Sequence, residues 1–170
     1  SSIANGGDLG FFTAMLPQGF YELENALYTL PIGKLSEPVK TSIGYHIIIV
    51  DHRRPARGMI EVAHILIRSE EGKKAEGKAT IDELYNKIKS GEDFNNLANQ
   101  FSQDKQTMKN GGVLPAFGIN TYDKSFEEAA FSLQKDGDVS MPIETKAGWH
   151  ILKRIKKPDY SNDASAFKKL

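Results

Sequence analysis

The chain has 170 residues with 22 basic and 22 acidic side chains, so charge gives no reason to expect nucleic acid or an anionic membrane as a partner. A hydrophobic fraction of 39% supports a packed core and argues against disorder. The absence of cysteine excludes disulfides and thiolate chemistry, and no apolar run of about 18 residues exists to span a bilayer.

The first part of the chain carries one predicted helix and two predicted strands. Apolar residues at helical spacing predict a helix over 20–30, which Pro31 ends. Segments 39–41 and 45–50 are predicted strands joined by a short turn. The polar segment 51–58, DHRRPARG, contains proline and glycine and is predicted to be a linker.

Residues 62–67 read VAHILI and are predicted to form a central strand. Side chains alternate along a strand, so Val62, His64 and Leu66 share one face. A histidine in such a strand costs stability unless another polar group partners it, and this directs attention to the second histidine-containing strand, 149–155.

The remaining elements alternate helices with loops before a closing hairpin, which predicts an α+β domain with a small, mostly antiparallel sheet flanked by helices. In order, they are a charged loop at 68–78, helices around 81–88 and 94–101, a polar loop at 102–112, a helix at 126–133 with Ser125 as its cap, strands at 139–145 and 149–155, and a short helix at 164–170.

An internal repeat links the two parts of the chain. NGGDL at 5–9 matches NGGVL at 110–114, an offset of 105 (110 − 5). GYHII at 44–48 matches GWHIL at 148–152, an offset of 104 (148 − 44). A unit of roughly 100 residues has the size of a small domain.

The first copy has no counterpart to residues 61–108, so it lacks one strand and two helices. We therefore expect the chain to be a fragment of a longer protein, divided into four parts. These are residues 1–54, the C-terminal half of a first domain; 55–60, a linker; 61–157, a complete domain; and 158–170, a tail.

The two histidine-bearing strands predict a polar site. If the strands are neighbours, His64 and His150 meet on one face, and Thr145 lies in the adjoining strand. Asp104 begins a loop that must return toward the sheet. A site with histidines at its base and apolar residues at its border suits a small hydrophobic ligand whose amide group is held by polar contacts. The candidate apolar residues are Leu114, Phe117, Tyr122 and Phe126.

Five motifs run through the second copy in a fixed order: AHILI at 63–67, FNNLANQFSQD at 94–104, NGGVLPAFG at 110–118, FEEAAFSL at 126–133 and TKAGWHILKRI at 145–155. Their order and spacing resemble the parvulin-type peptidyl-prolyl cis–trans isomerases. The first copy resembles the latter half of the same domain.

The resemblance assigns roles to the candidate residues. It implies that His64 and His150 are the paired imidazoles of the site. Asp104 takes a position that is cysteine or aspartate in different branches of the family, and Thr145 is the site hydroxyl. The proline pocket is implied to contain Leu114, Tyr122 and Phe126, with Phe117 either in the pocket or in the core.

Several residues depart from the family pattern. Tyr122 replaces the more usual methionine and Asp123 a glutamine, which we expect to alter pocket shape and to lower activity. Val113 replaces the usual acidic residue, Pro115 replaces a glycine, and Ala147 replaces a small hydroxyl residue.

The activity implied by the resemblance is rotation of Xaa–Pro bonds in folding proteins. The barrier to this rotation is roughly 18–20 kcal/mol, and no bond breaks, so neither a nucleophile, a metal nor another cofactor is expected. The implied partners are proline-containing peptides or unfolded client proteins. The implied location is the bacterial cell envelope, in the periplasm.

Two alternatives stay open. The domain would be a chaperone or peptide-binding module with little turnover if the Tyr122 ring fills the proline slot. The edge of the incomplete first copy would support self-association. His46, in that copy, lacks a histidine or aspartate partner and is expected to be structural.

Overall fold

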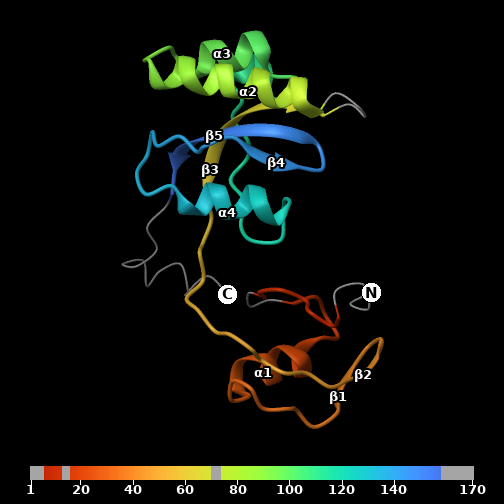
Figure 1. The fold of residues 1–170 in the computed structure, drawn as a ribbon. Helices are drawn as coiled ribbons and strands as arrows, with labels where there is room; N and C mark the ends of the chain where they lie inside the picture. Colours follow the sequence, from red (N-terminus) through yellow and green to blue (C-terminus); the bar gives the residue numbers. More distant parts are fainter. Residues whose placement is uncertain (1–5, 13–15, 70–73, 158–170) are drawn as a thin grey trace. The chain divides into compact units, whose positions relative to one another are not determined.

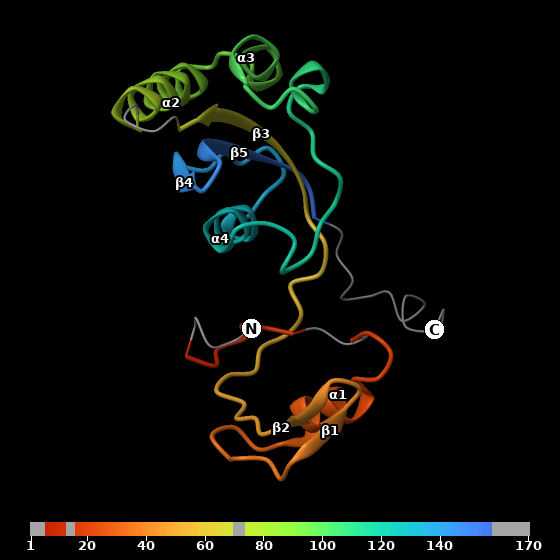
Figure 2. The same ribbon diagram turned by 90° about the vertical axis from the view of Figure 1, so that its right-hand side faces the viewer.

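A computed structural model describes residues 6–12, 16–69 and 74–157 (Figures 1 and 2). The chain divides into two compact units, Ser1–Ala56 and Arg57–Leu170, here called unit 1 and unit 2. The expected tail at 158–170, with its short helix, lies outside the described residues.

Unit 2 is built on a three-stranded antiparallel sheet with the order β3-β5-β4. β3 (Glu61–Arg68) pairs with β5 (Gly148–Lys156), which pairs in turn with β4 (Ile143–Thr145). The expectation that the strand at 62–67 is central is therefore wrong, because β5 occupies the middle. The outer edge of β3 is instead covered by a returning loop, in which Leu114 N donates to Val62 O at 2.9 Å.

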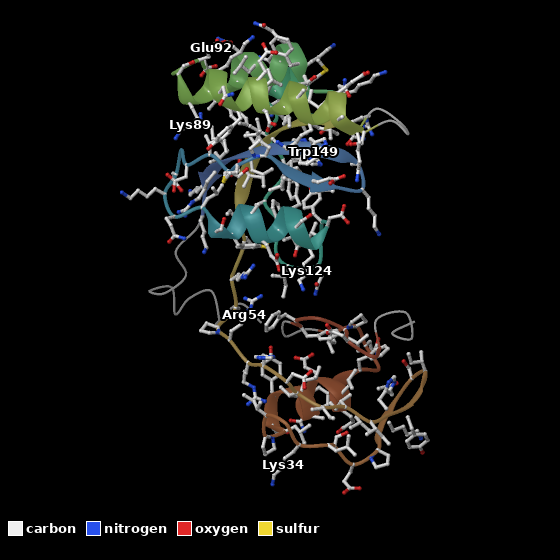
Figure 3. All side chains as sticks on the ribbon, in the orientation of Figure 1. Lys34, Arg54, Lys89, Glu92, Lys124 and Trp149 are labelled. Carbon is white, nitrogen blue, oxygen red and sulfur yellow. The ribbon has the colours of Figure 1, made fainter. Side chains whose placement is uncertain are left out.

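Helices cover both faces of this sheet (Figures 1 and 2). α2 (Lys74–Lys89) and α3 (Phe94–Phe101) lie on one face, and α4 (Lys124–Ser132) lies on the other. Trp149 lies on the α2 side (Figure 3). This arrangement confirms the expected α+β class.

The predicted alternation along β3 is confirmed. Ala63, Ile65 and Ile67 belong to the core cluster beneath α2 and α3. Val62 belongs to the second cluster, with residues of α4. Because a strand directs successive side chains to opposite faces, one short apolar sequence supplies both halves of the core.

Several predicted boundaries differ from the structure. The charged loop expected at 68–78 is too long, because α2 begins at Lys74. The ion pair between Lys78 and Asp82, four residues apart, stabilises this charged first part of the helix. Ser125 is not a cap: Asp123 is the N-cap of α4, and the Ser125 hydroxyl donates to Glu144 O at 2.9 Å.

Two further elements are shorter than expected or were not expected. β4 covers only Ile143–Thr145, although an isolated bridge pairs Val139 with Lys153. A short 3-10 helix, η2 (Met108–Asn110), lies in the predicted polar loop. It begins immediately after Thr107.

Unit 1 contains α1 (Tyr21–Thr29) and a two-stranded antiparallel sheet of β1 (Val39–Thr41) and β2 (Gly44–His46). Its hydrogen bonds repeat those of unit 2 at an offset of 104 (140 − 36). Ser36 N donates to Ile48 O at 2.9 Å, and Ser140 N donates to Leu152 O at 2.8 Å. Each serine hydroxyl also accepts from the opposite backbone amide, at 3.0 Å in both units.

The approach of the returning loop to β3 depends on Gly112. His64 N donates to Gly112 O at 2.8 Å, and Gly112 has a φ of +81°. A Cβ atom at this position would overlap the carbonyl oxygen of His64. Glycine therefore allows the loop to lie directly against the strand that carries the histidine.

We predict that Gly112→Ala lowers the free energy of unfolding by roughly 3 kcal/mol or more, the combined effect of left-handed backbone strain and overpacking. Gly91→Ala is the matched control, because its φ is +101° but a Cβ there would contact nothing within 4 Å. Backbone strain alone gives about 1–2 kcal/mol at Gly91. Urea unfolding measures both; equal losses would contradict the steric role of Gly112.

Candidate active site

Two buried histidines meet on the α4 side of the sheet. The register pairs His64 with Leu152 and Leu66 with His150, so the histidines are diagonal neighbours on one face. Their Nδ1 atoms are 3.3 Å apart, and the rings stack with centroids at 5.5 Å. The predicted meeting of the two imidazoles is thus seen in the structure.

Asp104 lies at one end of this histidine pair. Its Oδ2 lies 2.9 Å from His64 Nε2, and its side chain is 17% exposed. The Thr107 hydroxyl donates to the same oxygen at 2.5 Å and lies 3.2 Å from His64 Nε2. The aspartate is therefore held in place and still reaches solvent.

Thr107 is a site residue that the sequence analysis missed. It lies three residues after Asp104, and the Asp104 carboxylate also accepts from Gln106 N at 3.2 Å. An aspartate that accepts from the backbone two residues later is typical of an Asx turn. Such a turn does not indicate a hydroxyl partner for the carboxylate, so the sequence carried no specific signal for Thr107.

Thr145 lies at the other end of the histidine pair. Its Oγ1 lies 2.9 Å from His150 Nε2 and accepts from Ala147 N at 3.1 Å. One set of tautomers satisfies every group: the Thr145 hydroxyl donates to His150, His150 Nδ1–H donates to His64, and His64 Nε2–H donates to Asp104. Four side chains from three strands and one loop form a continuous hydrogen-bonded row.

Burial keeps both histidines neutral. Burial, with a smaller effect of the neighbouring His64, lowers the pKa of His150 to about 3. Burial also lowers the pKa of His64, against the opposing effect of Asp104. Burial raises the pKa of Asp104, but hydrogen bonds from Thr107 and His64 outweigh it and leave the pKa below 3.8. The site therefore carries one negative charge, on Asp104.

Aromatic rings border the histidine pair. The Phe126 ring meets His150 edge-on, with centroids 5.3 Å apart, and lies 6.0 Å from His64. Tyr122 packs at 5.0 Å from Phe126 and at 4.7 Å from Phe117. Tyr122 is 38% exposed, whereas Phe117 and Phe126 are buried in one cluster with Leu114. The predicted apolar residues thus lie together beside the polar row.

The Tyr122 hydroxyl experiences the charge of the site. Burial raises the pKa of Tyr122, and the negative charge of Asp104 raises it further. The phenol is therefore uncharged at neutral pH and lies within electrostatic range of the carboxylate.

Glu127 positions the loop that carries Tyr122, and the sequence analysis missed it. This carboxylate is 7% exposed and accepts from Thr121 N at 2.6 Å, Tyr122 N at 2.9 Å and Asn120 N at 3.0 Å. A charged residue beside Phe126 on the inward side of α4 was the available signal, since buried carboxylates require partners.

Unit 1 contains the same local arrangement as the Thr145–His150 end of the row. Thr41 Oγ1 lies 2.7 Å from His46 Nε2 and accepts from Ile43 N at 3.3 Å. Among the described residues, no second imidazole contacts His46. Nor do the described residues of either unit contain three histidine or carboxylate side chains grouped as a metal site.

Known proteins resemble this chain along most of its length. The family model for the rotamase PPIC-type PPIase domain matches residues 1–52 and 64–156. The chaperone SurA of Pseudomonas putida is 34% identical over 154 residues, covering 86% of this chain and 35% of that protein. Foldase protein PrsA 2 of Listeria monocytogenes is 38% identical over 112 residues, covering 64% of this chain and 36% of that protein.

A solved structure shows the same fold. The peptidylprolyl isomerase PrsA from Bacillus cereus has a TM-score of 0.54 and 33% sequence identity, covering 66% of this chain and 41% of that chain. The chain spans about a third of the length of the curated relatives it matches. Since the family model matches most of its residues, this chain belongs to the parvulin family, the rotamases with a PPIC-type PPIase domain.

Proposed function

We propose that unit 2 is a peptidyl-prolyl cis–trans isomerase that twists Xaa–Pro bonds without forming a covalent intermediate. The observation that carries this proposal is the neutral, hydrogen-bonded row that ends at a partly exposed anion, Asp104, beside the rings of Tyr122 and Phe126. The names of the relatives, a chaperone, a foldase and a peptidylprolyl isomerase, support it.

The chemistry requires only that the twisted amide be favoured over the planar one. In the planar amide, resonance places partial negative charge on the carbonyl oxygen and partial positive charge on nitrogen. Twisting removes this separation. A fixed negative charge beside the carbonyl oxygen therefore destabilises the planar state more than the twisted state. About 3–4 kcal/mol of such differential stabilisation accelerates rotation on the order of 10² to 10³-fold.

In this proposal Asp104 supplies the fixed charge and the three other polar residues position it. His64 donates to the carboxylate, and His150 with Thr145 fixes the tautomer of His64. A neutral pair is important, because an imidazolium beside Asp104 would cancel its field. Thr107, which donates to the same carboxylate oxygen, is a positioning residue.

The proline ring is held by the apolar side of the site. Leu114, Phe117 and Phe126 form the buried floor, and Tyr122 forms an exposed wall. Such an enclosure excludes water from one side of the amide, which strengthens the electrostatic effect of Asp104. The alternative function is that of a peptide-binding module with little turnover. It requires the Tyr122 ring itself to occupy the position of the proline ring.

The proposed substrates are proline-containing segments of unfolded client proteins, as the words chaperone and foldase in the names of the relatives suggest. We propose a location in the bacterial cell envelope, in the periplasm, as the resemblance to the family implies. Within the described residues, no helix is long and apolar enough to cross a membrane.

Unit 1 is proposed to be the C-terminal half of a second domain of the same kind, covering residues 1–54 and joined through a linker at 55–60 to the domain at 61–157. Three observations support this: the sequence offset of 104, the shared hydrogen bonds of Ser36 and Ser140, and the match of the family model to residues 1–52.

We predict that Asp104→Ala and His150→Ala each lower kcat/KM for an Ala-Pro peptide by roughly 10 to 100-fold, because each breaks the row that fixes the anion. Exchange NMR measures the isomerisation rate directly. His46→Ala is the matched control, because it removes the equivalent histidine of unit 1 and is expected to leave the rate unchanged. Equal losses in His46→Ala and His150→Ala would contradict the site.

A second prediction separates isomerase from binding module. Tyr122→Ala is expected to raise KM about tenfold with little change in kcat, because it removes a wall that binds substrate and transition state alike. Tyr122→Phe keeps the ring and should behave as the unchanged protein. An increase in kcat/KM for Tyr122→Ala would mean that the ring blocks the slot, which favours the binding module.

The pKa values also give a pH dependence of stability. The folded state holds His150 neutral down to about pH 3, whereas the unfolded chain takes up a proton near pH 6.5. The unfolded state thus binds more protons between these values, so stability falls as pH falls below 6.5. The lowered pKa of Asp104 acts in the same direction at lower pH, below 3.8.

We predict that the free energy of unfolding of unit 2 decreases by about 2 kcal/mol through His150 alone between pH 6.5 and pH 5. Urea unfolding at the two pH values measures this. His150→Gln, which cannot be protonated, should show a smaller decrease. A variant with the same pH dependence as the unchanged protein would show that His150 is not held neutral.

A further inference from the structure

Thr107 occupies a helix-capping position, but its hydroxyl does not cap the helix. It is the residue before η2, where a threonine side chain ordinarily accepts from a backbone amide of the first turn. Its side chain makes no such capping bond to η2. The hydroxyl instead donates to Asp104 Oδ2 at 2.5 Å, a short distance typical of hydrogen bonds to a charged oxygen. The side chain therefore acts on the carboxylate rather than on the helix.

The backbone of Thr107 joins this contact to the strand that carries His64. Gly112 N donates to Thr107 O at 2.9 Å, and His64 N donates to Gly112 O at 2.8 Å. His64 Nε2 lies 2.9 Å from the same Asp104 oxygen that the Thr107 hydroxyl contacts. The four residues thus form a closed ring of hydrogen bonds. Thr107 is 8% exposed, so solvent has little access to replace its hydroxyl.

Two donors on one oxygen favour the ionised form of Asp104, because a protonated carboxyl group is a weaker acceptor for both. Burial raises the pKa of Asp104. Among the effects that lower this pKa, the hydrogen bond from Thr107 is the largest, ahead of the bond from His64. The geometry and the direction of the shift therefore agree on the role of the hydroxyl.

The other titratable groups around Asp104 are held neutral at neutral pH. His64 on β3 faces the carboxylate, His150 lies behind it on β5, and Tyr122 precedes α4. Burial lowers the pKa of both histidines, that of His150 to about 3, and burial raises the pKa of Tyr122. The positive charge of Arg68, at the end of β3, acts on His150. The donors to Asp104 itself therefore decide where this carboxylate gains a proton.

We propose that Thr107 keeps Asp104 ionised in acid and thereby sets the lowest pH at which the site works as an isomerase. This inference rests on the proposed function, in which the charge of Asp104 favours the twisted amide. Thr107 is a positioning residue, since it contacts the carboxylate and not the substrate. Its removal is expected to change the pH dependence of activity, which a purely structural contact would not do.

The test is the pH profile of kcat/KM for a blocked Ala-Pro peptide, measured on the full chain by exchange NMR. In the unchanged protein the acid decline is expected only below pH 3.8. In Thr107→Val the midpoint of this decline should rise by about one to two pH units, the equivalent of one hydrogen bond to a charged group. Thr107→Ser keeps the hydroxyl and should restore the original midpoint. Equal midpoints in Thr107→Val and the unchanged protein would overturn the inference.

Carbon and nitrogen NMR assign the midpoint to one group. The carboxyl carbon shift of Asp104 follows the protonation of that side chain, and the imidazole nitrogen shifts follow His64 and His150. In Thr107→Val the Asp104 titration should move together with the activity. A midpoint that follows either histidine instead would overturn the inference. Thr107→Ala, which also lacks the hydroxyl, repeats the test if valine disturbs the amide spectrum of unit 2.

Two further variants complete the comparison. Thr80→Val is the matched control, because this exposed hydroxyl on α2 donates to Glu76 O at 3.0 Å, and the variant should keep the original profile. A shift as large as that of Thr107→Val would overturn the inference. Asp104→Ala separates the two proposals: low activity there with an unshifted profile in Thr107→Val overturns only the role of Thr107, whereas full activity in Asp104→Ala contradicts the proposed function itself.

Discussion

The contact between His64 and His150 determines how unit 2 is arranged. Two imidazoles 3.3 Å apart in a buried position are tolerated only if both are neutral and every ring nitrogen has a partner. Thr145 and Asp104 provide those partners at the two ends, and Phe126 closes the space edge-on. The negative charge of Asp104 is thereby placed at an end of the row that solvent reaches.

Sequence patterns predicted those parts of the structure that depend on the periodicity of apolar residues along a strand or helix. The alternation of β3 placed His64 correctly, and the GxH spacing of Gly148 and His150 indicated the second strand. What was missed depends on loop conformation and on distant packing. Thr107 acts on the Asp104 carboxylate within a loop, and Glu127 binds backbone amides of another loop; loops have no repeating pattern to read. Strand order was also missed, because pairing between segments far apart in sequence leaves no local trace.

The two units share a local hairpin structure but differ in what the histidine of that hairpin contacts. Thr41 with His46 and Thr145 with His150 form the same hairpin contact, at 2.7 Å and 2.9 Å. Within the part of the chain that the structure describes, only the histidine of unit 2 meets a second imidazole and, through it, a carboxylate. The threonine–histidine hairpin therefore forms without the rest of the site. Its chemistry depends on the strand that pairs beside it.

The position of β5 has a consequence for how the domain is made. Among the described residues of unit 2 it is the last strand in sequence, yet it lies between β3 and β4. During vectorial synthesis the two outer strands emerge first and cannot pair with each other in the native order. The contacts that join His64 to His150 span 86 residues, so they raise the contact order and are expected to form late. The polar row that depends on this contact is therefore expected to assemble only late in the folding of unit 2.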